Sequence, residues 1–261
     1  MAGKVVSILG CGWLGKALGR TLVNRGYLVN GSTTREENLI ILSGEGITPF
    51  LVNVEELSED RAVPFFNADV LIISLPQRAR AGKSEEYIHH IRRVMKAAHR
   101  GNVKQVILVS TTSVYPDMNR VVSEEDADAQ NPIVVAENIV RQSNIPATIL
   151  RFAGLFGPGR HPGKFLAGKT DVKGGDAPVN LIHLDDCIGI ISLIIEQNCW
   201  NQVFNACADD HPTRRAFYTK AAVDLGLQPP VFSGDSSIPY KIVSNTRLKT
   251  ALAYSFRHQL I

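Results

Sequence analysis

A short glycine-rich segment near the start of the chain has the spacing of a phosphate-binding turn. In GCGWLG, Gly10, Gly12 and Gly15 form a G-x-G-x-x-G pattern between a strand-like apolar run and a segment with helical periodicity. In this context the first glycine permits a tight turn, the second lets the backbone approach a pyrophosphate, and the third allows the helix to pack closely on the strand. We therefore predict a dinucleotide-binding turn; the alternative is a glycine turn without a ligand.

Two further features bear on how a dinucleotide would bind. The start of the predicted helix, at Trp13 and Leu14, offers backbone N–H groups and a partial positive charge to the pyrophosphate. An NAD site usually has an acid near the end of the second strand to hold the ribose 2′-OH, but NGSTTR has none. Thr34 offers a hydroxyl there, and Arg35 offers a guanidinium suited to a 2′-phosphate. We expect NADP(H) in preference to NAD(H); the alternative is that Arg35 is a solvated residue at the next helix start.

Two later strand ends are expected to complete the cofactor site. Asn53 follows the third predicted strand and is expected to reach the adenine edge. Ser74, Leu75 and Pro76 follow the fourth predicted strand and are expected to line the pyrophosphate and ribose. Both segments lie at the carboxyl ends of predicted parallel strands, where folds of this type bind ligands.

Hydroxyl side chains cluster after the fifth predicted strand, in STTSVYPD (residues 110–117). The Thr111 hydroxyl can hydrogen-bond a substrate carbonyl or alcohol and hold it for hydride transfer. Ser110, Thr111 and Thr112 can equally cap and satisfy backbone groups at the end of the strand. Both interpretations stay open at the level of sequence.

The elements that position these residues alternate between strands and helices. Apolar runs predict strands at 4–10, 27–34, 47–54, 68–76, 104–110 and 147–157, and helical periodicity predicts helices at 13–24, 35–46, 85–99 and 132–144. This order indicates an α/β protein with a Rossmann-type, doubly wound parallel sheet. A strand and helix at 181–198 and helices at 214–226 and 247–254 follow. Residues 1–261 are expected to form a single domain, with roughly 155–261 as a small C-terminal substrate lobe.

Composition excludes several classes of function. The net charge of +3 is spread along 261 residues without a Lys/Arg block, so we expect no nucleic-acid partner. No apolar run is long enough to cross a bilayer, and the N-terminal segment is typical of a strand rather than a signal peptide. The four cysteines lack CxxC spacing, which favours reduced thiols in a cytoplasmic protein. His161 and His183 have no second ligand at metal spacing, so we predict no metal.

Five segments together resemble a known family over nearly the whole chain. ILGCGWLG, STTSVY, ILRFAGLFGPGR, NLIHLDD and VFNACADDHPT, in this order, resemble the extended or atypical short-chain dehydrogenases/reductases, the NAD(P)-dependent epimerase/dehydratase group that acts on nucleotide sugars. The chain looks most similar to a short bacterial branch termed nucleoside-diphosphate-sugar epimerase-like, whose members often lack the full catalytic set. The resemblance implies that Thr111, four residues before Tyr115, is the catalytic hydroxyl. It also implies that Thr112 and Tyr115 lie beside the substrate.

The resemblance breaks at the family's Y-x-x-x-K pair, in which Tyr is the general acid/base and Lys lowers its pKa and holds the ribose. Residues 123–140 contain neither residue type. If Glu137 is aligned with the family's acidic residue, Ala129 and Ile133 occupy the Tyr and Lys positions. Neither side chain can replace a phenol of tuned pKa, and Tyr115 is not the catalytic tyrosine of the family.

The substrate side is better preserved. Arg160, with its neighbours His161 and Lys164, could bind a diphosphate or another acidic group, although a solvated basic loop is an equal alternative. Asn180 resembles a residue of the family's strand beside the substrate, whereas His183 is more typical of a hydrogen-bonded packing residue. The acidic run at 123–130 is expected to be a solvated loop.

Two function hypotheses follow. The leading one is an NADP(H)-dependent atypical dehydrogenase/reductase or epimerase that acts on a nucleotide sugar or a similar polar carbonyl compound, with Thr111 orienting the substrate. The alternative is a non-catalytic NAD(P)-binding redox sensor or regulator, which the missing Tyr and Lys favour. A third interpretation is a homodimer in which the partner subunit completes the site. The expected partner is a small-molecule substrate, not a nucleic acid or a membrane.

Overall fold

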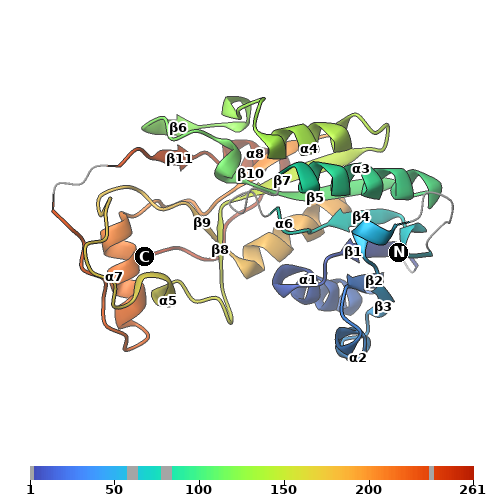
Figure 1. Ribbon diagram of the computed structural model, residues 1–261, viewed down its shortest axis with the longest axis horizontal. Helices are drawn as coiled ribbons and strands as arrows, with labels where there is room; N and C mark the ends of the chain where they lie inside the picture. Colours follow the sequence, from blue (N-terminus) through green and yellow to red (C-terminus); the bar gives the residue numbers. More distant parts are fainter. Residues whose placement is uncertain (1–2, 58–63, 78–83, 235–237) are drawn as a thin grey trace. The chain divides into compact units, whose positions relative to one another are not determined.

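The computed structural model describes residues 3–57, 64–77, 84–234 and 238–261. Within these residues a seven-stranded sheet has the strand order β10-β7-β5-β4-β1-β2-β3. Its strands are β1 (Val5–Leu9), β2 (Leu28–Thr33), β3 (Thr48–Leu51), β4 (Val70–Ile73), β5 (Gln105–Thr111), β7 (Ala147–Phe152) and β10 (Val203–Ala206). The pairs β1–β2, β1–β4, β2–β3 and β4–β5 are parallel, and Ile8 is level with Gly31 on one side and Ile72 on the other. This confirms the predicted doubly wound α/β fold (Figure 1).

The chain divides into two compact units. Unit 1 comprises Met1–Ser110, Ala129–Leu150 and Ile190–Val203, and unit 2 comprises Thr111–Asp128, Arg151–Gly189 and Phe204–Ile261. The helices are α1 (Trp13–Asn24), α2 (Glu37–Gly44), α3 (Ser84–Arg100), α4 (Pro132–Arg141), α5 (Gly163–Leu166), α6 (Leu184–Gln197), α7 (Arg214–Val223) and α8 (Thr246–Leu252). Among the described helices, none is both long and apolar enough to cross a membrane.

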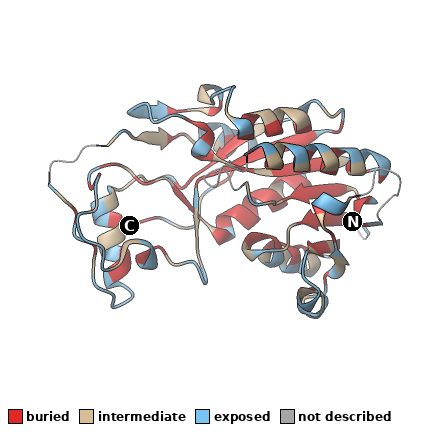
Figure 2. Cartoon of the chain, viewed as in Figure 1, coloured by how far each residue is buried: buried red, intermediate tan, exposed pale blue. Residues whose placement is uncertain are grey.

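Unit 1 has the layered arrangement that its hydrophobic pattern predicts. Helix α1 lies on one face of the sheet, and α3 and α4 lie on the other (Figure 1). Strand β4 is buried along its whole length, as expected for a central parallel strand covered on both faces. Buried residues concentrate in the strands and in the helix faces that cover them (Figure 2). Helix α1 begins and ends at the predicted residues, with Leu14, Leu18 and Leu22 buried on one face.

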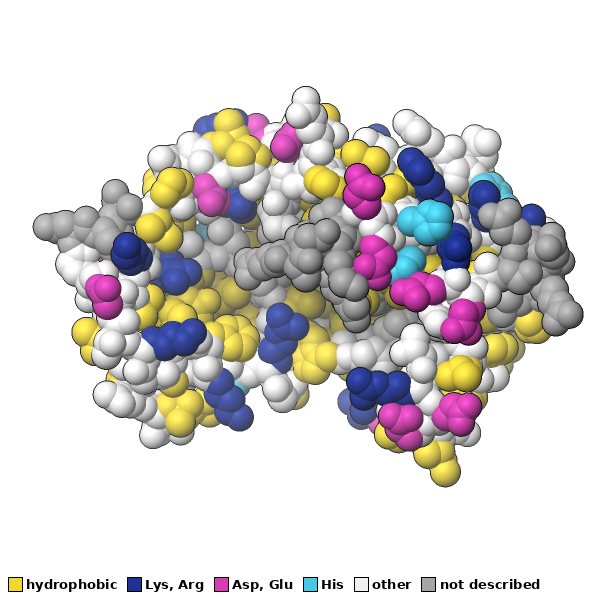
Figure 3. Space-filling model, viewed as in Figure 1, with side chains coloured by type: hydrophobic (Ala, Val, Ile, Leu, Met, Phe, Trp, Pro, Cys, Tyr) yellow, Lys and Arg dark blue, Asp and Glu magenta, His cyan; other side chains and the backbone are white. Residues whose placement is uncertain are grey.

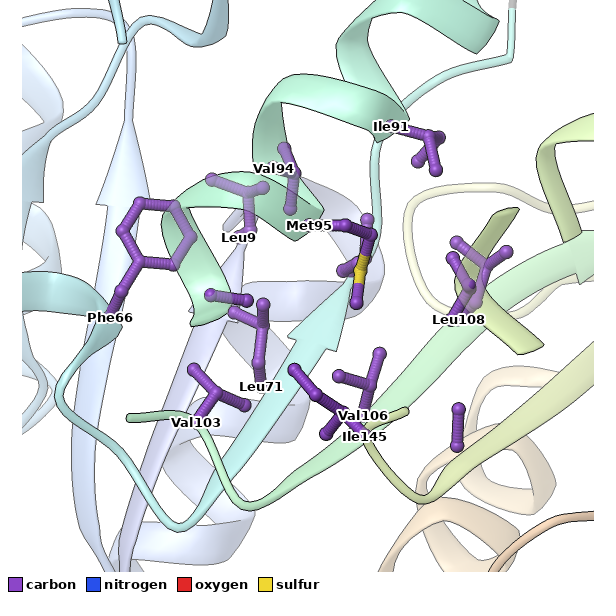
Figure 4. Close-up of a cluster of buried hydrophobic side chains, with 14 of the residues drawn as sticks. Leu9, Phe66, Leu71, Ile91, Val94, Met95, Val103, Val106, Leu108 and Ile145 are labelled. Carbon is purple, nitrogen blue, oxygen red and sulfur yellow. The ribbon is translucent and has the colours of Figure 1, made fainter. Parts of the chain in front are cut away.

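A large apolar cluster fills the space between the sheet and the helices α3 and α4. Ile91, Val94 and Met95 of α3 pack over strand residues such as Leu71 and Val106 (Figure 4). Leu71, Ile91 and Val106 have no exposed surface. Burial of this kind supplies most of the stability of a helix, because helix propensity alone is marginal in water. The cluster therefore holds α3 in place beside the strand ends of unit 1.

Unit 2 is built from short elements. Strand β8 (Gly154–Phe156) pairs with β9 (Leu181–His183), and β6 (Arg120–Val122) pairs with β11 (Lys241–Val243), both in parallel. A smaller apolar cluster that includes Val179, Leu181 and Phe217 packs beside them.

One predicted element is wrong: residues 147–157 form two strands in different sheets, not one. The chain leaves the seven-stranded sheet after Ala153, whose N–H still donates to Ala206 O at 3.0 Å. Gly154 N then donates to Asn180 O at 3.0 Å and starts β8, which pairs with β9. A Cβ at Gly154 would lie 2.6 Å from the end of the Leu181 side chain, so a larger residue here would displace that leucine. The continuous apolar run does not reveal this change of partner.

Helix α2 offers a matched pair of side chains for testing the core. Leu42 is 2% exposed and Ile40 is 78% exposed on the same helix. We expect Leu42→Ala to lower the free energy of unfolding by about 2–5 kcal/mol, since it leaves a cavity in a packed region. Ile40→Ala should change it by less than about 0.5 kcal/mol. Urea denaturation of both variants measures the difference; equal effects would mean that α2 does not dock as described.

Candidate functional site

The glycine turn is fixed by close backbone contacts within unit 1. Gly10 has φ +101°, a conformation that favours glycine, and its N–H donates to Ser32 Oγ at 2.8 Å. A Cβ on Gly10 would lie 2.5 Å from the Ser74 carbonyl oxygen, and one on Gly15 would lie 2.3 Å from the Gly10 carbonyl oxygen. Burial raises the pKa of the Cys11 thiol in this turn to about 12, so it stays protonated. Two of the three glycines are therefore required by packing alone.

Gly12 differs from its neighbours. A Cβ on Gly12 would meet nothing within 4 Å, and its φ of −79° suits any residue. It is the N-cap residue of α1 and supplies no side-chain hydrogen bond to the helix. Open space at this one position, at a helix N-terminus, fits the approach of a pyrophosphate and agrees with the role predicted for the second glycine. Trp13 and Leu14 begin the helix beside it, Trp13 half-buried and Leu14 buried.

The turn after β2 places Thr34 and Arg35 at the surface. Thr33 Oγ1 accepts a hydrogen bond from Arg35 N at 3.1 Å, which shapes the backbone of the turn. Helix α2 begins at Glu37, so Arg35 precedes it rather than lying in its first turn. The Arg35 side chain is exposed and belongs to the same strand end as Thr34.

A cavity of about 160 Å³ in unit 1 brings together residues from three strand ends. Four of the predicted cofactor residues line it: Thr34 after β2, Asn53 after β3, and Leu75 and Pro76 after β4. Asn53 caps the 3₁₀ turn η1 (Val54–Glu56): its Oδ1 accepts from Glu55 N at 3.1 Å. Ser74 does not line the cavity, but its carbonyl oxygen contacts the glycine turn. The geometry thus gathers segments that are separate in the sequence at one edge of the sheet.

Sequence reasoning missed the wall that α3 contributes to this cavity. The side chains concerned are Glu86, Tyr87 and His90, with Glu55 and Gln77 nearby. Figure 3 shows histidine and acidic side chains gathered over α3. Tyr87 is 3% exposed, and its hydroxyl makes no hydrogen bond of ordinary geometry with a described residue, although Gln77 lies close enough to lower its pKa slightly. Burial raises the pKa of this phenol, so it is a neutral donor beside the cavity. Helical spacing of Glu86 and His90, at i and i+4, is the signal that could have located this wall.

The three hydroxyl residues after β5 have different surroundings. In unit 1, Ser110 is buried and donates to Glu137 Oε1 at 2.5 Å. In unit 2, Thr111 is half-buried and caps the 3₁₀ turn η4 (Thr112–Val114), accepting from Ser113 N at 3.2 Å. Thr112 is buried in that turn. The capping interpretation therefore describes what these hydroxyls do in the structure, and a catalytic role for Thr111 stays a prediction.

Tyr115 belongs to a buried polar network in unit 2. Its hydroxyl donates to Asn205 Oδ1 at 2.6 Å and accepts from Arg151 Nη1 at 2.8 Å. Burial raises its pKa to about 12. Arg151 also donates to the carbonyl oxygen of Glu124, whose carboxylate accepts from Asn205 N at 2.8 Å. The phenol is thus already engaged as both donor and acceptor.

The same network corrects the prediction of a solvated acidic loop at 123–130. Glu124 is 8% exposed, and Glu124–Asp126 forms a 3₁₀ turn, η5, closed by a capping box between Ser123 and Asp126. The Glu124 carboxylate is buried because it accepts a hydrogen bond from the Asn205 backbone N–H, which would otherwise lie buried without a partner. A run of acids looks solvated in a sequence, and only the fold shows which member faces inward.

The positions of the absent catalytic pair lie at the start of α4. Ala129 is exposed just before the helix, whereas Ile133 is 3% exposed on its packed face. Asn131 caps the helix, accepting from Ile133 N at 2.9 Å, and Pro132 opens its first turn. The segment is therefore an ordinary helix start with an apolar inner face.

Two of the predicted substrate residues, Asn180 and Arg160, flank the β8–β9 pair of unit 2. Asn180 immediately precedes β9 and anchors β11: its Nδ2 donates to Lys241 O at 2.9 Å and its Oδ1 accepts from Val243 N at 2.8 Å. Arg160 is exposed in the tight turn after β8, where Gly157 and Arg160 form a bridge. Since the two strands are parallel, Asn180 and Arg160 lie toward opposite ends of this pair.

Comparisons with known proteins agree with this geometry. A model of the NAD(P)H-binding family matches residues 10–181. Protein YeeZ of Escherichia coli (strain K12) is 36% identical over 267 residues, covering 98% of this chain and 96% of the relative. The solved structure of MoeE5 in complex with UDP-glucuronic acid and NAD superposes with a TM-score of 0.81 at 20% identity, covering 99% of this chain and 95% of that one.

A further solved structure, UDP-glucose 4-epimerase from Thermotoga maritima with UDP-glucose, gives a TM-score of 0.77 at 17% identity over 98% of this chain and 94% of that one. At such identities the two solved structures show a shared fold and no more. The family match spans most of the chain and includes the glycine turn and the cavity. The chain therefore belongs to the NAD(P)H-binding family, as its resemblance to the NAD(P)-dependent epimerases and dehydratases implies.

Proposed function

We propose that the chain binds NADP(H) in preference to NAD(H) and uses it as an atypical dehydrogenase/reductase or epimerase on a nucleotide sugar or a similar polar carbonyl compound. The observation that carries the proposal is the convergence at one sheet edge in unit 1. There, the open space at Gly12 adjoins a helix N-terminus, and the ends of β2, β3 and β4 surround one cavity. The nicotinamide cofactor would supply hydride transfer; the protein supplies binding and orientation.

The residues of unit 1 fit the parts of a dinucleotide. Backbone N–H groups at the start of α1 would hold the pyrophosphate. The cavity between Asn53 and Leu75 would hold the adenosine, with the buried Tyr87 hydroxyl as a donor at its wall. Arg35 would grip the 2′-phosphate, because its guanidinium is exposed at the strand end that also supplies Thr34.

The substrate assignment rests on unit 2 and on relatives. Thr111 would orient a substrate oxygen, and the exposed Arg160 would contribute to the substrate surface. Thr112, Tyr115 and Asn180 would act behind that surface, because Thr112 and Tyr115 are buried and the Asn180 amide is bonded to β11. MoeE5 and the Thermotoga maritima epimerase have UDP-sugars bound in their structures, which supports a nucleotide sugar here. The Arg160 guanidinium suits the diphosphate of such a substrate.

A second candidate is a non-catalytic NAD(P)-binding sensor or regulator. Two observations favour it: Ile133 is packed where the family has lysine, and the Tyr115 phenol is tied to Asn205 and Arg151. A homodimer whose partner completes the site is a third arrangement. In either of the first two cases the cofactor site of unit 1 is the same.

The preference for NADPH can be tested with Arg35→Ala. Charge-assisted hydrogen bonds to a phosphate are worth about 1.5–3 kcal/mol, so NADPH affinity should fall roughly 10- to 100-fold. NADH affinity should change less than about threefold, since NADH has no 2′-phosphate. Energy transfer from Trp13 in the glycine turn to the nicotinamide follows both titrations. Arg100→Ala, at the far end of α3, is the matched control. Equal losses for both cofactors would contradict the 2′-phosphate assignment.

Two alanine variants of the glycine turn should separate an effect on NADPH binding from an effect on stability. Gly12→Ala should leave the free energy of unfolding within about 1 kcal/mol of wild type, because its Cβ enters open space. It should weaken binding of NADPH at least tenfold, because the methyl group occupies the path of the pyrophosphate. Gly15→Ala should lower stability by about 1–3 kcal/mol through its clash with the Gly10 carbonyl. Calorimetric titration measures NADPH affinity, and urea denaturation measures the free energy of unfolding. Unchanged NADPH binding in Gly12→Ala would contradict the assignment of the pyrophosphate to this turn.

A measurement of NADPH turnover distinguishes the enzyme hypothesis from the sensor hypothesis. If the chain is an enzyme, oxidation of NADPH in the presence of keto-sugar nucleotides should fall roughly 100-fold in Thr111→Val. Cofactor binding should be unchanged, and Thr111→Ser, which keeps the hydroxyl and the cap of η4, should restore most of the activity. Tight NADPH binding without any turnover by the wild-type chain would instead favour the sensor.

A further inference from the structure

Unit 2 contains a second cluster of chemically capable side chains that the proposed function does not use. His183 at the end of β9, Asp185 in the first turn of α6 and His258 near the C-terminus come together, although 73 residues separate Asp185 from His258. One ligand atom from each lies within 4.8 Å of the other two. We call these three residues the His–Asp–His cluster.

Two distances in the cluster are compatible with ligand atoms that share one metal ion. Asp185 Oδ2 lies 3.0 Å from His258 Nε2 and 3.4 Å from His183 Nδ1. Two ligand atoms on one tetrahedral zinc ion are about 3.3 Å apart, given bonds of about 2.0–2.1 Å. The rings of His183 and His258 are stacked, with centroids 3.6 Å apart and an angle of 28°. Because Phe156 packs against His183, the more exposed His258 ring would have to turn for both nitrogens to face one ion.

We propose, contrary to the expectation from the sequence that His183 lacks partner ligands, that the His–Asp–His cluster binds a divalent first-row transition metal ion, of which zinc is the reference case. Two imidazoles and one carboxylate form a donor set that suits such ions better than Mg²⁺ or Ca²⁺. Open coordination positions would be filled by water, because Asp185 and His258 are partly exposed to solvent.

The surroundings of His183 prepare it to be a ligand. Its ring packs against the edge of Phe156, 5.1 Å away, which limits its rotation. The buried carboxyl group of Asp186 lies beside the cluster and adds negative charge that attracts a cation.

Binding exchanges existing contacts for metal bonds. The His183 Nδ1 lone pair now accepts a hydrogen bond from Asp185 N at 3.2 Å, which the ion would replace. That amide is in the exposed first turn of α6, where water can satisfy it. Protons compete with a metal ion for imidazole nitrogens and carboxylate oxygens, so binding should weaken as the pH falls.

The consequence of the site is a cross-link between the C-terminal segment and the core of unit 2. Asp186 already holds this segment by accepting from Tyr254 Oη at 2.7 Å and from Arg257 N at 2.9 Å. Asp210 accepts from Leu260 N at 2.8 Å. A metal ion between these two attachments would join the segment to β9 and α6, and would stabilise the folded chain by mass action.

The experiment uses the full chain, stripped of metals with a chelator and titrated at pH 7.5. With Co²⁺ we expect visible d–d absorption bands that saturate at one ion per chain, and with Zn²⁺ a calorimetric binding isotherm and a raised Tm. His258→Gln and Asp185→Asn should each weaken binding at least 100-fold, because even outer-shell partners of metal sites are worth 10- to 100-fold. Lowering the pH to 5.5 should weaken binding to the wild-type chain.

The matched control addresses a second histidine–carboxylate group found among the described residues. Glu55, Glu86 and His90 also lie within 4.8 Å of one another, so His90→Gln tests whether an ion binds there instead. We expect wild-type affinity in His90→Gln. Loss in His90→Gln with retention in His258→Gln would overturn the proposal, and so would the absence of saturable binding of Co²⁺ and Zn²⁺ to the wild-type chain. Neither readout depends on a dinucleotide, so the result is separate from the proposed function.

Discussion

The close contact between the glycine turn and the end of β4 is the constraint on which the cofactor side of the molecule depends. Ser74 N donates to Leu9 O at 2.8 Å, and the Ser74 carbonyl occupies the space that a side chain at Gly10 would fill. This contact brings the β4 loop against the start of α1. The strands β1 and β4 are level along their length, so the Ser74–Pro76 loop and the glycine turn end at the same edge. The glycine turn and the Ser74–Pro76 loop therefore lie together at the edge where we propose that the dinucleotide binds.

Packing, rather than polar contact, sets the cavity next to this edge. The apolar cluster under α3 fixes the helix, and the helix then presents Glu86, Tyr87 and His90 to the cavity. A tyrosine hydroxyl without a partner in such a setting costs free energy unless a ligand or water satisfies it. Helix α3 therefore has two roles. Its inner face packs in the core, and its other side supplies the polar wall of the cavity.

Local signals allowed the first half of the chain to be predicted from its sequence. The period of Leu14, Leu18 and Leu22 and the apolar run of β4 each depend on near neighbours only. The contacts of unit 2 are long-range, so pattern alone did not reveal them. Glu124 meets Asn205 across 81 residues, and β7 ends where a change of strand partner begins β8. The wall from α3 was missed for the same reason, since which side of an amphipathic helix meets a cavity depends on tertiary packing.

Packing in α4 explains why the lysine of the family's catalytic pair is absent here. An ammonium group at the position of Ile133, which is 3% exposed, would be buried, and a buried charge is tolerated only with a partner. Isoleucine instead adds apolar surface to the inner face of the helix. Likewise the Tyr115 phenol, with its pKa raised by burial and both hydrogen-bonding roles filled, could exchange a proton only by breaking the network with Asn205 and Arg151. An apolar residue at the lysine position and a fully bonded phenol at Tyr115 both serve the packing of the fold, so neither this helix nor this phenol is available for proton transfer.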